Sequence, residues 1–366
     1  MKKGLRKPLI VILGIVLLLG ITACGANTQQ ASSDNAQNTE TSNASNTTNE
    51  PLVIKVADSF PTSHLIPKFG TIPWMEKIEE RSEGKIKFEY YPAEQLGKAT
   101  SLLDVVRNEV AHIVYLGPLY ISDKLPLSTV AGNPGLVPEA LTGSLAYHKL
   151  VTEDLYEAEL KKHGVKPLWA GTTNPYQIVN SKHPVHTIED FKGLKIRTSG
   201  GIQENVMQAW GAIPVSIPAP EQYTAWERGT IDGTLLSFFS WPGYQTEKVA
   251  KYSTTNAALS AFGVMYVVNE KVWNSWPQEV QDVILEVSAE IPEMLAKSII
   301  EEEAKMVEEY KELGIEFYEL PPDELERWNK ELAPFNEEWA KEQDAKGLPG
   351  TEILEKFRQY IEEFSQ

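Results

Sequence analysis

Residues 194–236 read LKIRTSGGIQENVMQAWGAIPVSIPAPEQYTAWERGTIDGTLL, and short apolar runs alternate in them with segments of helical periodicity. The pattern predicts strands at 194–197, 212–215 and 231–236, separated by helices at 201–210 and 221–228. Strands that alternate with helices are typical of α/β domains in which most strands are parallel. This stretch therefore predicts an α/β fold.

The same alternation extends over the chain from Pro51 to its end. Upstream it predicts strands at 52–57, 85–91, 112–116 and 165–170, with helices at 67–82, 102–107 and 143–163. Downstream it predicts a strand at 262–269, a long helix at 277–313 with a kink at Pro292, and a helical, acidic tail at 321–366. The order of these elements predicts two lobes, 51–174 with 262–301 and 175–261 with 302–366.

A ligand cleft is expected between the lobes, because open α/β sheets bind ligands beyond the carboxyl ends of their strands. The chain would cross between the lobes near 173–176 and 260–263, which are the expected hinge, and the long helix would span both lobes. A weak internal repeat also suggests two related lobes: Arg107–Val110 precedes one strand as Arg228–Ile231 precedes another. A single pair of this kind can also arise by coincidence.

The N-terminus has the layout of a secretory signal peptide, with Lys2, Lys3, Arg6 and Lys7 before an apolar run from Leu9 to Leu19. That run is too short to span a bilayer permanently. It ends in ITACG, which resembles the bacterial lipoprotein box and predicts cleavage after residue 23 and lipidation of Cys24. The alternative is an ordinary signal peptide followed by an incidental cysteine.

Residues 24–50 are expected to be a disordered tether, because Asn27 to Glu50 holds no apolar residue larger than alanine. A lipid on Cys24 would hold the protein on the extracytoplasmic side of the cell membrane. Cys24 is the only cysteine in the chain, which excludes an internal disulfide.

The charge of the chain argues against nucleic acid as a partner. Residues 1–23 hold four of the 34 basic residues and none of the 51 acidic ones, so the remaining chain has a formal charge of −21. Such a surface does not favour a polyanion or an anionic membrane face. A small anionic ligand is still compatible, because a single local arginine can bind it.

The common catalytic motifs are absent from the sequence. It holds no Walker loop, no G-x-G-x-x-G, no G-x-S-x-G and no H-E-x-x-H. Only His183 and His186 are close enough to suggest a metal pair, and their setting in HPVH is more typical of a solvated turn. The sequence therefore predicts no enzyme, no cofactor and no metal site.

Arg197 is the residue that best fits a binding role. It ends the strand in FKGLKIR (Phe191–Arg197) and is followed by TSGG, whose glycines open a helix. An arginine in this position can present a bidentate fork to a carboxylate, and nearby backbone N–H groups add to an anion site. On local pattern alone, a surface arginine paired with one of the many acids is the simpler interpretation.

KGLKIR, together with WGAIPVSIPAPEQYTAWERGTIDG (Trp210–Gly233), resembles the signature of the solute-binding proteins of TRAP transporters, the DctP-like family. Upstream, GKIKFEYYPAEQLG (Gly84–Gly97) is similar to the first-lobe motif of that family. Val267–Val283 is similar to its later strand and helix. The resemblance runs in order from Pro51 to about Gly314.

The resemblance implies a two-lobed, periplasmic-binding-protein-like fold that closes on a small organic carboxylate and delivers it to integral-membrane TRAP permease subunits. It also implies that Arg197 forms the salt bridge to the ligand carboxylate. A binding protein of an ATP-driven importer would share the fold and the anchor, and only the motifs argue against it.

Departures from the family pattern suggest the kind of ligand. NPYQ (Asn174–Gln177) stands where several members carry a second arginine, and LLSFF (Leu235–Phe239) is more apolar than usual. Ser59 and Gly117 lack the acids of members that bind amino-sugar acids. These differences favour a monocarboxylate with an apolar or aromatic body. The candidate pocket residues are Tyr115, Tyr176, Phe238, Phe239, Trp241 and His64, and core packing is the alternative for each.

Overall fold

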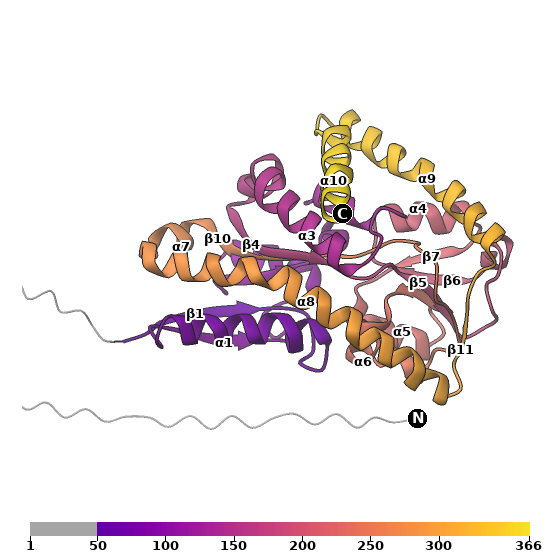
Figure 1. Cartoon of the computed structure of the whole chain (residues 1–366), viewed down its shortest axis with the longest axis horizontal. Coiled ribbons are helices and arrows are strands. Elements are labelled where there is room, and N and C mark those ends of the chain that lie inside the picture. The colour runs from indigo at the N-terminus through magenta and orange to yellow at the C-terminus, as the bar shows by residue number, and fades with distance from the viewer. Residues whose placement is uncertain (1–49) are drawn as a thin grey trace, which may run out of the picture. The chain divides into compact units, whose positions relative to one another are not determined.

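The computed structural model describes residues 50–366, in which helices surround two β-sheets (Figure 1). The predicted signal peptide, Cys24 and the tether up to residue 49 lie outside the described residues. None of the helices between residues 50 and 366 combines the length and apolar composition needed to cross a bilayer.

The first sheet has the order β2-β1-β3-β10-β4. Its strands are β1 (Leu52–Ala57), β2 (Ile86–Tyr91), β3 (Ile113–Leu116), β4 (Val165–Thr172) and β10 (Gly263–Asn269). β1 is parallel to both β2 and β3, whereas β10 is antiparallel to β3 and β4. The sheet is therefore mixed, because a strand from far along the chain enters it in the opposite direction.

The second sheet has the order β11-β9-β5-β8-β6-β7. Its strands are β5 (Gln177–Asn180), β6 (Lys195–Thr198), β7 (Ile213–Ser216), β8 (Gly233–Leu236), β9 (Tyr252–Thr254) and β11 (Glu316–Tyr318). β6 is parallel to β7 and β8, and β5 is antiparallel to β8 and β9. The sequence pattern missed β5, β9 and β11, which have three or four residues and lie outside the alternation of strands and helices that located the equally short β6, β7 and β8.

The two sheets contain the same unit. β2-β1-β3 and β7-β6-β8 have equal order, and each is built as strand, helix, strand, helix, strand, with helices α1 (Ile72–Arg81), α2 (Leu102–Arg107), α4 (Ile202–Ala209) and α5 (Ala219–Glu227). After α2 the chain turns through Glu109 at φ 57°, and after α5 through Gly229 at φ 68°. Each of these residues stands four positions before the next strand. The internal repeat in the sequence is therefore a structural repeat.

Two crossings join the sheets side by side. One leads from β4 to β5 and the other from β9 to β10. They are hydrogen-bonded to each other: Tyr176 N donates to Ser260 O at 2.7 Å, and Thr173 N donates to Phe262 O at 3.1 Å. These are the segments expected to be the hinge.

The remaining helices cover the sheets. They are α3 (Ala140–Leu150), α6 (Trp241–Tyr244), α7 (Glu270–Ser275), α8 (Gln278–Glu312), α9 (Pro322–Ala345) and α10 (Gly350–Phe364). The helix predicted at 143–163 is α3, continued by a wider π-helical segment at Val151–Leu160 and a short 3-10 turn. The predicted long helix is α8, which contacts α1, α3 and β4 at one end and β11 at the other (Figure 1).

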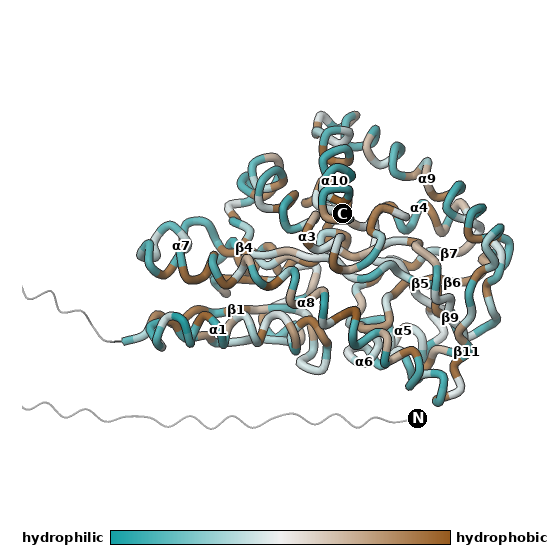
Figure 2. Tube along the Cα trace, viewed as in Figure 1, coloured by the Kyte–Doolittle hydropathy of each residue, from teal (hydrophilic) through white to brown (hydrophobic). Residues whose placement is uncertain are grey.

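The C-terminal helices differ from the predicted division of the lobes. α9 packs on α4 beside the second sheet, but α10 returns to pack on α3 beside the first. Lys149 of α3 pairs with Glu363 of α10 at 2.8 Å. Assigning all of 302–366 to the second lobe is therefore wrong for α10, because its apolar face is buried against a first-lobe helix. Figure 2 shows hydrophilic residues along much of α9 and α10, while brown segments concentrate nearer the sheets.

Candidate functional site

Arg197 is a fully buried cation without an acidic partner among residues 50–366. Its Nε donates to Ile217 O at 2.8 Å, and its Nη2 donates weakly to Tyr120 Oη at 3.4 Å. Its Nη1 has no hydrogen-bond partner in the described part of the chain. A buried charge is expensive unless it is paired, so this guanidinium is suited to an anion that is not part of the chain.

The strand β6 fixes the direction of this guanidinium. Ile196 points to one face of the sheet and packs in the core, so Arg197 points to the other face. β6 is held on both sides, since Arg197 is in register with Val215 of β7 and Thr234 of β8. The backbone of the site is therefore rigid.

The two lobes approach each other directly after this strand. Gly200 has φ +103°, and a Cβ built on it would lie 2.6 Å from Leu119 O of the first lobe. Such a contact is closer than any real Cβ tolerates. A glycine is required here for the lobes to come this close.

Tyr120 is the first-lobe residue that contacts Arg197. It lies in the 3-10 segment Pro118–Ile121 that follows β3, and its ring centre is 5.9 Å from Arg197 Cζ. Its Oη also accepts a hydrogen bond from Ala219 N at 3.2 Å. Sequence reasoning missed Tyr120, although its place just beyond the carboxyl end of a strand was an available signal.

A narrow cavity lies beside Tyr120, between the two lobes, and its volume of about 10 Å³ shows that the side chains around it nearly fill the space. Its lining is mostly aromatic and apolar and includes His64, Tyr120 and Phe262 from the first lobe and Tyr176, Leu236 and Tyr244 from the second. Arg197 does not itself line this space but reaches its edge through the hydroxyl of Tyr120. The site thus has an apolar body and a cationic end.

His64 and Tyr176 are the predicted site residues that line the cavity. His64 Nδ1 accepts a hydrogen bond from Ile66 N at 3.1 Å, whereas its Nε2 has no partner among the described residues. Burial lowers the pKa of His64 to about 3, so its ring is neutral. Tyr176 lies in the crossing between the sheets, and its ring stacks on Phe262 at 6.5 Å.

Tyr115 and Phe239 stand behind this lining. Tyr115 packs against Phe60 at 4.4 Å between ring centres, and its buried hydroxyl has no partner in the described part of the chain. Phe239 meets the ring of His64 edge to face at 5.6 Å. Both support the cavity from the second layer of side chains.

Phe238 and Trp241 are directed elsewhere. Trp241 stacks on Tyr310 of α8 at 4.9 Å and on Phe317 of β11 at 5.8 Å. Phe238 packs edge to face against both Trp241 and Phe317. Neither lines the cavity, because α8 and β11 provide them with an apolar environment on the other side of the segment.

Several buried hydroxyls without partners stand at the carboxyl ends of strands. Within residues 50–366 they are Ser59 after β1, Thr172 at the end of β4, Thr198 and Ser199 at the end of β6, and Ser237 after β8. Buried polar groups are normally hydrogen-bonded, so unpaired ones at these strand ends fit a site for a polar ligand.

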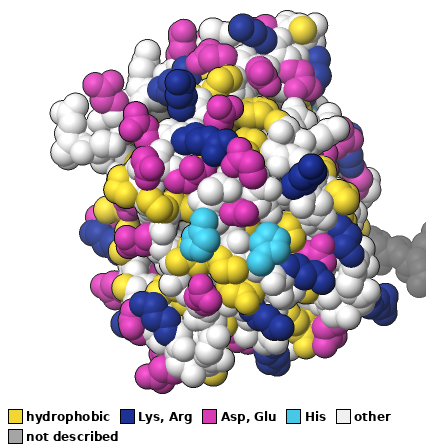
Figure 3. All heavy atoms as spheres, turned by 90° about the vertical axis from the view of Figure 1, so that its right-hand side faces the viewer, with side chains coloured by type: hydrophobic (Ala, Val, Ile, Leu, Met, Phe, Trp, Pro, Cys, Tyr) yellow, Lys and Arg dark blue, Asp and Glu magenta, His cyan; other side chains and the backbone are white. Residues whose placement is uncertain are grey.

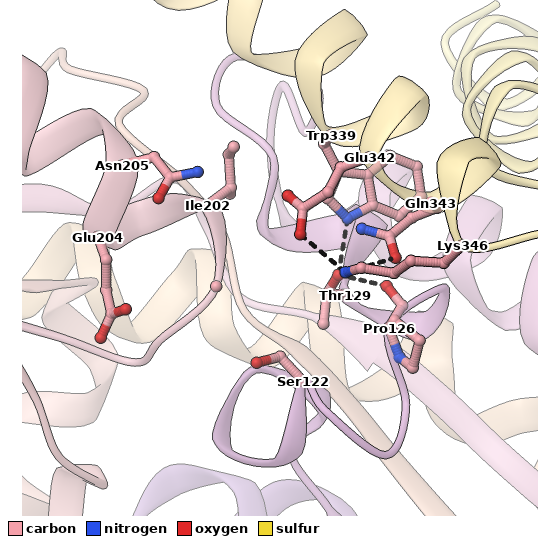
Figure 4. A pocket seen from close by; sticks show the side chains of 11 residues that line it. Ser122, Pro126, Thr129, Ile202, Glu204, Asn205, Trp339, Glu342, Gln343 and Lys346 are labelled. Atoms are coloured by element: carbon pink, nitrogen blue, oxygen red, sulfur yellow. Dashed lines mark hydrogen bonds and ion pairs between the residues drawn. The ribbon is translucent and has the colours of Figure 1, made fainter. Parts of the chain in front are cut away.

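A larger and more open pocket lies between the 3-10 segments of the first lobe, α4 and α9 (Figure 4). Two pairs of its polar groups are engaged: Trp339 Nε1 donates to Thr129 Oγ1 at 2.9 Å, and Lys346 pairs with Glu342 at 2.7 Å. None of the described residues that line this pocket is a buried polar group without a partner, so nothing in it demands a ligand.

The histidine pair of the sequence is separated at the surface. His183 Nδ1 lies 3.0 Å from Pro184 O, and the His186 ring packs against Tyr318 at 4.6 Å. Residues 50–366 contain no cluster of three or more side chains arranged to hold a metal ion. Figure 3 shows two histidines on one face, among acidic and basic side chains that are interspersed.

The comparisons with known proteins agree with this architecture. Residues 61–343 match the family model for bacterial extracellular solute-binding protein, family 7 (DctP). The C4-dicarboxylate-binding periplasmic protein DctP of Rhodobacter capsulatus is 27% identical over 307 residues, which covers 80% of this chain and 87% of that protein. The 2,3-diketo-L-gulonate-binding periplasmic protein YiaO of Escherichia coli is 26% identical and covers 65% of this chain and 73% of that protein.

Solved structures share the fold. A marine metagenome TRAP solute-binding protein specific for aromatic acids, crystallised with 3-hydroxybenzoate, superimposes with a TM-score of 0.81 at 23% identity, over 87% of this chain and 100% of that one. A TRAP solute-binding protein from Rhodoferax ferrireducens with benzoate gives 0.80 at 22% identity, over 86% and 98%. The chain therefore belongs to bacterial extracellular solute-binding protein family 7, the solute-binding proteins of TRAP transporters, and is not an enzyme.

Proposed function

We propose that this protein captures a monocarboxylate with an apolar or aromatic body between its lobes and delivers it to a TRAP permease. The observation that carries this is the buried guanidinium of Arg197, which has an unpaired Nη1 and no acidic partner among residues 50–366. A bidentate pair with a ligand carboxylate would satisfy it, and such pairs are strong when water is excluded.

A single carboxylate fits the site better than two. Arg197 is the one fully buried arginine or lysine in the described part of the chain. His64 in the cavity is neutral, because burial lowers its pKa to about 3. A second carboxylate would therefore be buried without a cation, which is unfavourable. Similar structures hold the monocarboxylates benzoate, 3-hydroxybenzoate and mandelate, and another, with a TM-score of 0.75, holds the dicarboxylate malonate.

Capture would occur by hinge closure. The crossings at 173–176 and 255–262 connect the sheets, and α8 contacts both lobes, so the lobes can rotate about these segments. Tyr120 and Leu119 of the first lobe, which lie against Arg197 and Gly200 in this structure, would move away from them when the lobes open. The closed form presents the surface that the permease recognises, while lipidated Cys24 holds the protein at the extracytoplasmic face of the cell membrane.

A thermal-shift assay tests this function. Residues 24–366 with Cys24→Ser would be refolded free of endogenous ligand and heated with a panel of mono- and dicarboxylates, alongside Arg197→Ala. Ligand at about a hundred times its dissociation constant stabilises a protein by about 2.7 kcal/mol. We expect a shift with aromatic monocarboxylates that disappears in Arg197→Ala. Silence across the panel, or shifts indifferent to Arg197, would contradict the proposal.

A further inference from the structure

His64 lines the cavity, and its buried Nε2 is a hydrogen-bond donor without a partner among residues 50–366. We infer that this donor binds a neutral oxygen on the body of the ligand, so that the preferred solutes are hydroxy or oxo monocarboxylates. This inference rests on the proposed function, since Arg197 is taken to hold the carboxylate.

The hydrogen bonds of His64 fix which ring nitrogen carries the proton. Nδ1 accepts from Ile66 N at 3.1 Å, so it is unprotonated, and in a neutral ring the proton must be on Nε2. Nε2 has no partner among the described residues although the side chain is buried. An unsatisfied buried donor is unfavourable, and a ligand oxygen that accepts from it recovers that loss.

The packing around the ring keeps Nε2 in place. His64 comes from the first lobe but packs against the second-lobe segment at Phe239 and Tyr244, with ring centres 5.6 and 5.0 Å away. A Cβ built on Gly243 would lie 2.5 Å from His64 Cδ2. The absence of a side chain at Gly243 thus admits the ring, and the close fit prevents it from turning away.

The surroundings favour a neutral oxygen over a second carboxylate. Asp58 accepts from Phe60 N at 3.0 Å on the first-lobe side, and Glu303 of α8 accepts from Phe239 N at 2.9 Å on the second-lobe side. Both are buried acids beside residues that pack against His64, and burial raises the pKa of each to about 7, so neither can offer a cation to a second carboxylate. Burial keeps the ring of His64 neutral by lowering its pKa, and keeps the phenol of Tyr244 neutral by raising its pKa. A hydroxyl or keto oxygen needs only the single N–H that His64 offers.

Two other histidines show which feature is distinctive. His148 Nδ1 accepts from Ala170 N at 3.2 Å, and His112 Nδ1 accepts from Lys55 N at 3.0 Å. Neither lines the cavity, so acceptance from a backbone N–H is a structural role that they share with His64. What distinguishes His64 is its unpaired Nε2 between the lobes. His148 shares the backbone hydrogen bond but does not line the cavity, so it serves as a matched control.

The experiment measures affinity for matched ligand pairs by calorimetry. The pairs are 3-hydroxybenzoate with benzoate and mandelate with phenylacetate, and the proteins are wild type, His64→Leu, His64→Gln and His148→Leu. For at least one pair, we expect wild type to bind the hydroxylated member about tenfold more tightly, the effect of one recovered buried hydrogen bond. His64→Leu should bind both members equally, whereas His148→Leu should keep the preference. His64→Gln, which retains an N–H donor, should restore part of it.

The outcomes separate this inference from the proposed function. Carboxylate binding that depends on Arg197 but shows no hydroxyl preference, or a preference that survives in His64→Leu, overturns the role of His64 alone. Loss of all carboxylate binding in wild type overturns both. If circular dichroism shows that His64→Leu does not fold, His64→Gln is compared with wild type instead. The role of His64 is contradicted if the two proteins prefer the hydroxylated ligand equally in both pairs, or if neither protein prefers it.

Discussion

Tyr120 of the first lobe covers Arg197 of the second, with Nη2 3.4 Å from Tyr120 Oη and Cζ 5.9 Å from the ring centre. On the other side, Nε is held by Ile217 O at 2.8 Å. The planar guanidinium is therefore fixed at two points and presents its remaining Nη1 in one direction. This preorganisation limits the entropy lost when a ligand binds.

Replacing this fork by a point charge should weaken binding strongly. Arg197→Lys keeps the charge but cannot donate to Ile217 O and also form a bidentate pair with a carboxylate. We expect the affinity for an aromatic monocarboxylate to fall about a hundredfold, or about 2.7 kcal/mol, measured by calorimetry. The exposed Arg228→Lys should bind like wild type. An unaffected Arg197→Lys would mean that charge alone holds the ligand.

Gly200→Ala should impair closure more than folding. The new Cβ would meet Leu119 O of the opposite lobe at 2.6 Å, whereas a Cβ added at Gly193, which has φ +79°, would meet no atom within 4 Å. Both Gly200→Ala and Gly193→Ala place alanine at a positive φ, which costs about 1–2 kcal/mol of stability by thermal denaturation. We expect only Gly200→Ala to lose ligand affinity as well, by about tenfold or more. Equal affinities in the two variants would show that this contact does not limit closure.

Glu303 links α8 to the hinge, and its amide analogue should weaken that link. Its carboxylate accepts from Phe239 N at 2.9 Å and from Asn174 Nδ2, while Asn174 Oδ1 accepts from Ala140 N at 2.7 Å. In Glu303→Gln, one orientation of the new amide makes its NH2 group, a donor, face the donor Nδ2 of Asn174. In the other orientation, the NH2 group faces the donor N–H of Phe239. Each orientation therefore loses one hydrogen bond.

We therefore expect Glu303→Gln to lower the free energy of unfolding by about 1–3 kcal/mol in urea denaturation. The neighbouring Glu302→Gln removes only a pair with the exposed Lys305 at 2.8 Å and should change stability by less than about 1 kcal/mol. Similar losses in the two variants would contradict a specific role for Glu303.

Stability should depend on pH through His64. Burial lowers its pKa from 6.5 to about 3, so its contribution is fully present above pH 6.5 and is lost as the pH falls from 6.5 toward 3. Asp58 acts in the opposite sense: burial raises its pKa from 3.8 to about 7, so its contribution is present below pH 3.8 and is lost as the pH rises through 7.

The difference between wild type and His64→Leu isolates the histidine from Asp58. Between pH 6.5 and 5, wild type should lose up to about 1.4 kcal/mol per pH unit relative to the variant, measured by urea denaturation. Parallel curves would show that His64 has the same pKa in the folded and the unfolded chain.

Cys24 should determine where the protein resides. If it carries the lipid, wild type expressed in a bacterial host will fractionate with membranes, and Cys24→Ser will move to the soluble extracytoplasmic fraction with its fold intact. Mass spectrometry of the N-terminal peptide should show diacylation in wild type. Equal release of both proteins would favour an ordinary signal peptide.

The fold and the position of Arg197 were readable from the sequence because they depend on local patterns. Apolar periodicity located all five strands of the first sheet, three of the six strands of the second and the long helix α8, and the KGLKIR stretch placed Arg197 on a short strand followed by glycines. Even the repeat at Glu109 and Gly229 was visible, since a helix end and the following strand lie within a few residues. The packing of α10 on α3 could not be predicted, because the sequence of an amphipathic helix shows that one face is buried but not which element covers it.

The sequence by itself determined the alternation of strands and helices, the family motifs and the position of Arg197 at the end of a strand, because each is encoded within a few consecutive turns or strands. The tertiary structure decided which aromatic residues meet that arginine. Tyr120 contacts Arg197 although it is 77 residues away along the chain, whereas Trp241 packs on Tyr310 and Phe317 and does not line the cavity. Such choices follow from competition among apolar surfaces for the same buried space, and only the packed lobes resolve that competition.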